Sequence, residues 1–198
     1  MTKIDKNILA QLRELTGCGM LDCRAALEET GGNLDLAVDI LRKKGAAIAS
    51  KRAIKETTQG IVKAYIHPGD MLGVLLEINC ETDFVARTPE ISQFANDVCM
   101  QIAALNPLYL TPEEVDQKFL EHEKSVLREQ LANSGKPAHI LDGIIQGKLK
   151  KLYSDICLLE QSFIKDDTVT IRQRLQELIA KTGENVKIRR FARFEIGK

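Results

Sequence analysis

The spacing of apolar residues changes along this chain, and that change restricts the fold more than any other feature of the sequence. Over residues 5–45 apolar residues recur every three to four positions, which is typical of helices packed on one face. Over residues 60–80 they alternate with polar residues, which is typical of strands with one buried face. The helical spacing returns after residue 88, and alternation reappears over residues 186–196. We therefore predict an α+β fold, in which helices pack on the apolar face of one small antiparallel sheet.

Residues 5–45 are predicted to form three short helices. The first has a stripe of apolar residues and stops at residues 16–19, and the second spans about residues 21–30. Asn33 is a good N-cap for the third, and Gly45 is expected to end it. The residues expected in their shared core are Ile8, Leu12, Leu15, Cys23, Ala26, Leu27, Leu34, Ala37, Val38 and Leu41.

A bundle of this size resembles a ubiquitin-associated domain, a class of small folds that bind other proteins. The apolar pattern weakens over residues 46–59, which suggests a helical or irregular linker. We therefore expect residues 1–54 to form an N-terminal domain and residues 55–198 to form the core domain.

The core domain is predicted to contain a three-stranded antiparallel sheet. Residues 60–67 and 72–80 form a hairpin around turn residues 67–70, and the third strand lies near the C-terminus. Arg190 interrupts the apolar side of this third strand. The residues expected on the buried face are Val62, Ala64, Ile66, Leu72, Val74, Leu76, Ile78, Cys80, Val186, Ile188, Ala192, Phe194 and Ile196.

Helices are predicted between the second and third strands. One opens at Thr88 and Pro89, and a second starts at a capping box over residues 111–114. The second ends at residues 134–137 and pairs with the next helix as an antiparallel hairpin. A last helix is expected over residues 168–182, ending at Gly183.

Charge and composition exclude several classes of function. Lys plus Arg and Asp plus Glu each total 28, so the formal net charge is zero, which argues against a protein that coats nucleic acid. No apolar run reaches the ~18 residues that span a bilayer. Asp5 and Lys6 precede amphipathic sequence where a signal peptide would have an apolar core. We expect a cytoplasmic protein with no membrane association and no direct nucleic-acid binding.

The sequence offers no arrangement of side chains suited to catalysis. The three histidines, His67, His122 and His139, have no Ser, Cys or carboxylate at a spacing that suggests a triad or a metal site. The five cysteines are odd in number and scattered, which is typical of free cytosolic thiols. We therefore expect neither an enzyme nor a bound cofactor or metal.

Residues 79–87 do not fit a plain structural interpretation. Phe84 stands directly after Asp83 in a connection where the apolar alternation has already ended. In one interpretation Phe84 folds back beneath the following helix and Asp83 caps a turn. In the other, Phe84 projects as an aromatic anchor that inserts into another protein.

Two long motifs resemble those of the elongation factor Ts family. The first begins at Leu15 and includes Thr16, Gly17, Gly19, Met20, Asp22, Cys23 and Arg24. The second is Glu77-Ile78-Asn79-Cys80-Glu81-Thr82-Asp83-Phe84-Val85-Ala86-Arg87. Residues 193–197 resemble the strand that ends the family's core, and residues 134–137 also fit. Leu21 departs from the family by standing where many relatives have a second Met.

The resemblance implies a guanine-nucleotide exchange factor that acts on elongation factor Tu. In the family, the loop matched by Thr82, Asp83, Phe84 and Val85 enters the GTP-binding domain and dislodges Mg²⁺. The stretch matched by Thr16, Gly17, Gly19, Met20, Asp22 and Arg24 contacts the same domain. Because the chain stops at Lys198, it resembles short forms, which lack a protruding coiled-coil module and dimerise through the core.

Three alternatives to nucleotide exchange remain open on the sequence. Basic clusters at residues 148–151 and 187–190 would suit an RNA-associated or ribosome-associated adaptor. Cys80 or Cys23 could serve an enzyme as a nucleophile. Residues 1–45 alone would suit a ubiquitin-associated-type binder.

Overall fold

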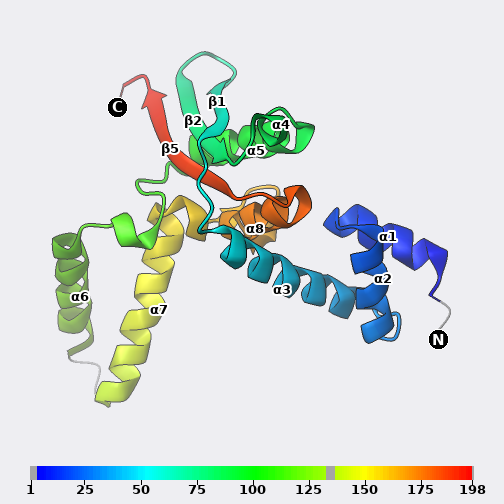
Figure 1. Cartoon of the computed structure of the whole chain (residues 1–198). Helices are drawn as coiled ribbons and strands as arrows, with labels where there is room; N and C mark the ends of the chain where they lie inside the picture. Colours follow the sequence, from blue (N-terminus) through cyan, green and yellow to red (C-terminus); the bar gives the residue numbers. More distant parts are fainter. Residues whose placement is uncertain (1–3, 133–136, 198) are drawn as a thin grey trace. The chain divides into compact units, whose positions relative to one another are not determined.

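The computed structural model describes residues 4–132 and 137–197. It has the predicted α+β architecture, with a helical N-terminal region and a three-stranded sheet (Figure 1). Contacts divide the chain into two compact units. The first contains Met1–Tyr65, Leu75–Cys99 and Arg172–Ala192, and the second contains Ile66–Val74, Met100–Ile171 and Arg193–Lys198. Each unit combines segments that are far apart in the sequence, so the units do not test a single boundary along the chain. The domain boundary predicted at residue 54 stays a prediction.

Three helices form the N-terminal region: α1 (Lys6–Thr16), α2 (Met20–Glu29) and α3 (Leu34–Arg52). The carboxylate of Asp5 caps α1 by accepting from the N–H of Asn7, and the side chain of Asn33 caps α3 by accepting from Leu36. Their shared core contains Leu9, Leu12, Cys23, Ala26, Leu27, Ala37 and Leu41.

Two predictions about these helices are wrong. Leu15 is 62% exposed, and Leu9 occupies the core in its place, because the stripe on α1 is set by the spacing of Leu9 and Leu12. Gly45 does not end α3, which continues to Arg52. Gly45 adopts helical geometry within α3, and a Cβ at this position would lie 3.4 Å from the Cβ of Ala180.

The strands β1 (Gln59–Ile66) and β2 (Leu72–Cys80) form the predicted hairpin, and β5 (Val186–Glu195) completes a sheet of order β1-β2-β5. The N–H of His67 donates to the carbonyl of Leu72 at 2.9 Å across the turn. The central strand β2 has the predicted buried face, made of Val74, Leu76, Ile78 and Cys80.

The face predicted for β1 is wrong. Val62 and Ile66 are 72% and 59% exposed and Ala64 is exposed as well, whereas Ile61 and Tyr65 lie on the more buried side. A shift of one residue moves every side chain of a strand to the opposite face. Because β1 carries apolar residues in both phases, the alternation alone does not decide between them.

The face predicted for β5 is correct in its first half only. Val186 and Ile188 are buried, but Phe194 and Ile196 are each 66% exposed and Ala192 is exposed too. Arg189 and Arg190 are two successive exposed residues, so the alternation changes phase there, as it does at an extra residue in a strand. Arg190, which interrupts the sequence pattern, marks the position of this change.

Helix α5 (Pro89–Leu105) begins where the sequence predicts, after the short helix α4 (Asp83–Ala86). Its periodic apolar residues are buried, namely Ile91, Phe94, Ala95, Val98 and Ile102. Gln101 is fully buried on α5, and its amide donates to the side chain of Gln161 and to the carbonyl of Ser162.

The capping box at residues 111–114 does not start the long helix. It forms a single 3₁₀ turn, η1 (Pro112–Glu114), and α6 (Gln117–Ala132) begins after it. Asp116 accepts from the N–H of Lys118 at 3.1 Å and so starts α6 in place of Thr111. Val115, between these two segments in the sequence, has extended backbone geometry and is buried in a small core with Leu120 and Cys157, which interrupts the helix.

Helix α7 (Ala138–Ile156) lies beside α6, as the predicted helical hairpin requires (Figure 1). Most of the predicted ending of α6, Ser134, Gly135 and Lys136 before Pro137, lies outside the described residues. After α7 come η2 (Leu158–Glu160) and two short strands, β3 (Ser162–Phe163) and β4 (Asp166–Thr170).

The last helix, α8 (Ile171–Thr182), starts three residues later than predicted. The β-branched residues Thr168, Val169 and Thr170 form β4 instead, and Val169 is buried. Throughout residues 4–132 and 137–197, no helix combines the length and the apolarity that crossing a bilayer requires.

Candidate functional site

Thr82, Asp83, Phe84 and Val85 form the start of α4, a helix of one turn between β2 and α5. Thr82 is the N-cap, with extended backbone geometry, and its hydroxyl accepts from the N–H of Val85 at 3.4 Å. The carbonyl of Thr82 accepts from the N–H of Ala86 at 3.2 Å. The sequence predicts a connection here, and the structure shows that the connection is a short capped helix.

Phe84 projects from α4 into solvent. Its exposed fraction is 81%, while Ala86 in the same helix is 6% exposed and Cys80 before it is fully buried. Phe84 therefore does not fold back beneath α5. An exposed phenyl group on a well-anchored turn is the arrangement that an aromatic anchor for another protein requires.

The carboxylate of Asp83 lies beside Phe84 and pairs with Arg87, at 3.0 Å between Oδ2 and Nη2. The pair joins residues four apart on the outer surface of α4, and the Arg87 side chain is 79% exposed. Exposed pairs of this kind stabilise little, so Asp83 can exchange Arg87 for another donor at small cost.

Thr82 is held by a residue near the other end of the chain. The carboxylate of Glu184 accepts from the main-chain N–H of Thr82 at 3.0 Å and from its hydroxyl at 2.7 Å. The thiol of Cys80 donates to the carbonyl of Thr82 at 3.1 Å. The main-chain N–H, hydroxyl and carbonyl of Thr82 all have partners, so the base of α4 is fixed while Phe84 stays exposed.

The N-terminal motif occupies the turn between α1 and α2 and the first turns of α2. Gly17 ends α1 in left-handed geometry, with φ of 65°, which explains why the position suits glycine. The hydroxyl of Thr16 donates to the carbonyl of Leu12 at 2.7 Å. Asp22 pairs with Lys44 of α3 at 2.5 Å.

The rest of this motif faces solvent. Gly19 and Arg24 are exposed, and Met20 and Leu21 are 46% and 80% exposed. Leu15, Met20 and Leu21 give the turn an apolar, accessible surface. A bundle of three helices does not need these exposed side chains for its own core. Cys23, by contrast, is fully buried in that core.

Lys181 of α8 lies close to both candidate segments. Its ammonium group is 3.2 Å from the carboxylate of Glu90, six residues after Phe84. Its aliphatic chain lies 3.4 Å from the position that a Cβ on Gly17 would occupy. A cleft of about 490 Å³ includes Thr16, Gly17, Pro89, Glu90 and Lys181 in its lining.

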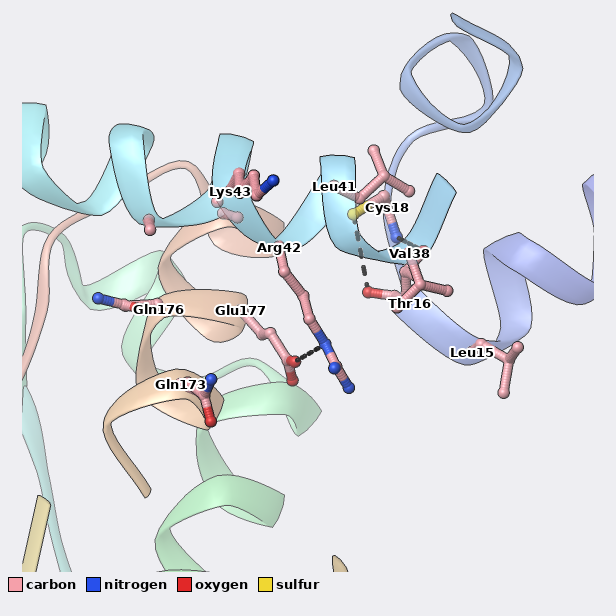
Figure 2. A pocket seen from close by; sticks show the side chains of 13 residues that line it. Leu15, Thr16, Cys18, Val38, Leu41, Arg42, Lys43, Gln173, Gln176 and Glu177 are labelled. Carbon is pink, nitrogen blue, oxygen red and sulfur yellow. Dashed lines mark hydrogen bonds and ion pairs between the residues drawn. The ribbon is translucent and has the colours of Figure 1, made fainter. Parts of the chain in front are cut away.

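A second pocket, of about 240 Å³, is lined by residues from α1, the turn after it, α3 and α8 (Figure 2). Arg42 and Glu177 face each other across it, with 3.9 Å between Nε and Oε1, and both reach solvent. None of the buried polar residues in the described part of the chain lines it. We find no arrangement in its lining that would support catalysis.

Burial disfavours the alternative that Cys80 or Cys23 is a nucleophile. Desolvation raises the pKa of both thiols, and the nearby carboxylate of Glu184 raises the pKa of Cys80 further. A reactive cysteine needs a lowered pKa and access to solvent. Both thiols are fully buried and donate weak hydrogen bonds to the main chain, Cys23 to Cys18 and Cys80 to Thr82.

Comparison with known sequences identifies the family. The profile described as "Elongation factor TS" matches residues 27–198. The chain belongs to the elongation factor Ts family. It is 52% identical over 195 residues to "Elongation factor Ts" of Caldanaerobacter subterraneus subsp. tengcongensis, covering 98% of each chain.

Two further relatives in the elongation factor Ts family show the same extent of similarity. The chain is 51% identical to the protein of Carboxydothermus hydrogenoformans, covering 98% of this chain and 90% of the relative. It is 49% identical to that of Fervidobacterium nodosum, covering 99% of this chain and all of the relative. The family that the two sequence motifs indicate is therefore confirmed.

Sequence reasoning missed Glu184 and Asn185 as parts of this site. They lie in the short connection between α8 and β5, where the pattern predicts only the end of a helix. A polar pair directly before a strand that begins with buried Val186 is a weak signal. Only the sheet order, which places β5 beside β2, brings these residues to Thr82.

Proposed function

We propose that this chain is a translation elongation factor that promotes nucleotide exchange on elongation factor Tu. It binds the GDP-bound GTPase, displaces Mg²⁺ and accelerates GDP release so that GTP can enter. Membership of the family supports the partner and the activity. The observation that carries the residue assignment is the 81% exposure of Phe84 on a turn whose base is fixed at Thr82.

Phe84 is the residue that inserts into the GTPase, and Thr82, Asp83 and Val85 shape the turn that presents it. A buried aromatic anchor typically costs at least ~2 kcal/mol of binding when it is truncated. Asp83, which pairs with the exposed Arg87, supplies a carboxylate that competes for donors around the Mg²⁺ site.

The physical basis of release is the strict geometry of magnesium. Mg²⁺ requires near-ideal octahedral coordination, so a small displacement of its ligands weakens the hold on the diphosphate. A protein that binds the distorted, empty GTPase more tightly than the filled one lowers nucleotide affinity by the same factor. Each ~1.4 kcal/mol of this difference changes the affinity about tenfold.

The N-terminal motif provides the second contact with the GTPase. Thr16, Gly17, Gly19, Met20, Asp22 and Arg24 contact the nucleotide-binding domain. In support, the turn exposes Met20 and its neighbour Leu21, and a protein surface with exposed apolar side chains around a rigid turn suits docking. Residues 1–54 form this docking domain, of the ubiquitin-associated type, and residues 55–198 the core.

The chain forms a homodimer through its core. Ile66, Met71, Phe194 and Ile196 are each more than half exposed and together line one groove. The N–H of Ile196 donates to the carbonyl of Met71 at 2.9 Å, which holds the end of β5 against the hairpin. A second copy burying the same groove removes these apolar side chains from water. The protein acts in the cytoplasm, without a cofactor and without direct contact to nucleic acid.

The experiment that tests this function follows release of a fluorescent GDP from elongation factor Tu by stopped flow. With unlabelled GDP in excess, addition of this chain should accelerate the loss of fluorescence in proportion to its concentration until it saturates. Release that is unaffected at any concentration would refute the proposal. Binding of RNA that weakens steeply with salt would favour the adaptor alternative instead.

A further inference from the structure

Residues 81 and 82 form hydrogen bonds with residues 184 and 185 at the base of the exposed turn. Glu184 accepts from the N–H and the hydroxyl of Thr82, and Glu81 accepts from the main-chain N–H of Asn185 at 2.6 Å. Residues 81 and 82 directly follow β2, and residues 184 and 185 directly precede β5. Each chain segment thus contributes one carboxylate that accepts hydrogen bonds from the other segment.

The surroundings of these hydrogen bonds are largely shielded from solvent. Asn185 is 2% exposed, and its side-chain amide donates to the carbonyl of Lys55 at 2.7 Å. Arg52, at the end of α3, pairs with Glu81 at 3.5 Å, and the Glu81 side chain is 19% exposed. Hydrogen bonds to a charged acceptor in such a setting are stronger than neutral ones in water.

The one-turn helix α4 needs this support. A helix of four residues forms too few hydrogen bonds of its own to offset the cost of nucleation. Its cap is Thr82, and the orientation of Phe84 depends on where that cap is held. A carboxylate that binds both the N–H and the hydroxyl of the cap fixes its position and its rotamer together.

We propose that Glu184 is a positioning residue for nucleotide exchange, which holds Thr82 so that Phe84 is presented in the conformation that enters the GTPase. This inference rests on the proposed function for the role of Phe84. Without the carboxylate, the turn samples other conformations, and only a fraction of the molecules is ready to bind. The apparent affinity for the GTPase falls by that fraction, while the bound complex is unchanged.

The test measures stopped-flow release of fluorescent GDP from elongation factor Tu over a range of concentrations of each variant. For Glu184→Ala we expect the half-saturating concentration to rise about tenfold, as loss of a charge-assisted hydrogen bond implies, with the maximal release rate retained. Glu184→Gln should fall between the unaltered chain and Glu184→Ala, because its amide oxygen can still accept from Thr82 but the hydrogen bond is no longer charge-assisted. Glu129→Ala, at an exposed position of α6, is the control for loss of a carboxylate.

A double variant separates positioning from a general loss of structure. If Glu184 acts through the turn, adding Glu184→Ala to Phe84→Ala should cause little further loss, since the anchor is already absent. Additive losses, or a lower maximal rate with an unchanged half-saturating concentration, would overturn the proposal. Should Glu184→Ala fail to fold, Glu184→Asp, which keeps the charge but shortens the reach, must raise the half-saturating concentration in the same way.

Hydrogen exchange in the free chain tests the positioning without the partner. The N–H groups of Ala86 and Arg87 close α4, so Glu184→Ala should speed their exchange selectively and leave those of α5 unchanged. Unchanged exchange at these two amides would refute the positioning role. If they respond but the unaltered chain fails to release GDP, the positioning stands and the exchange function is what fails.

Discussion

The carboxylate of Glu184 accepts two hydrogen bonds from Thr82, a residue 102 positions earlier in the chain. This contact fixes the base of a turn whose outermost side chain, Phe84, is 81% exposed. The turn is therefore held from within, and its aromatic group remains available to a partner.

Phe84→Ala should sharply slow the release of GDP from elongation factor Tu and leave folding intact. The exposed phenyl group contributes little to the core, so the midpoint of thermal unfolding should stay nearly constant. Truncation of an anchor costs at least ~2 kcal/mol, which corresponds to about a thirtyfold loss. Stopped-flow release of fluorescent GDP measures this loss. Leu108→Ala, a substitution at another exposed apolar position, is the control. Release at the unaltered rate would remove Phe84 from the mechanism.

Gly60→Ala should destabilise the chain, because β1 passes very close to β2 at this position. A Cβ on Gly60 would lie 2.1 Å from the carbonyl oxygen of Ile78 and 2.8 Å from the Cα of Asn79. Both neighbours are backbone, so the strand must move, at a cost of roughly 1–3 kcal/mol. The free energy of unfolding in urea measures this cost.

Gly143→Ala is the matched control for that substitution. Gly143 lies in α7, is exposed, and a Cβ there would meet no atom within 4 Å. The change should stabilise the helix by about 0.5–1 kcal/mol, since alanine has the higher helix propensity. If both variants lost stability equally, the close approach at Gly60 would not be the cause.

Phe194→Asp should convert a dimer into a monomer. Phe194 is 66% exposed in the groove that also contains Ile66, Met71 and Ile196, and an unpaired carboxylate opposes burial of that groove. Sedimentation velocity at several concentrations should show a single monomer for this variant. Phe84→Ala should keep the dimer, because it lies outside the groove. A monomeric unaltered chain would refute the proposed dimer.

The sequence was sufficient to predict the long helices, the three strands of the main sheet and the two motifs, because long periodic runs and adjacent residues express local physics; it was not sufficient for the short elements α4, η1, β3 and β4. It predicted the buried face of β2, whose alternation is uninterrupted through Val74, Leu76 and Ile78. It failed for β1, where Ile61 and Tyr65 compete with Val62 and Ile66 for the same face. Neither pattern is stronger until the neighbouring strand selects one.

The candidate site shows the same limit more sharply. Phe84 and Asp83 could be chosen from the sequence, since an aromatic residue in a connection breaks the local pattern. Glu184 could not, because a glutamate after Gly183 is an ordinary residue at the end of a helix. Its role exists only once β5 has paired beside β2, and that pairing is a long-range event with no local signal.

Cys99 and Cys157 should resist thiol reagents in the folded chain. Burial raises the pKa of each to about 11, well above the ordinary value of a thiol, so at pH 8 each thiolate is present in only about one molecule in a thousand. Cys18 is the partly accessible thiol among the five cysteines and should react first. A colorimetric thiol titration before and after adding guanidinium counts the two classes. Rapid reaction of all five thiols in the native chain would contradict the burial.

The raised pKa values also predict that stability falls in alkali. Between pH 9 and 11 the folded chain keeps protons on Cys99 and Cys157 that the unfolded chain releases, so the free energy of unfolding decreases as the pH rises through this window. Urea unfolding at pH 8 and pH 10.5 should show a lower midpoint at the higher pH. Because Cys99→Ala removes one of the two groups, its midpoint should fall less over the same interval. An equal fall in both chains would assign the alkaline loss to other titrating groups.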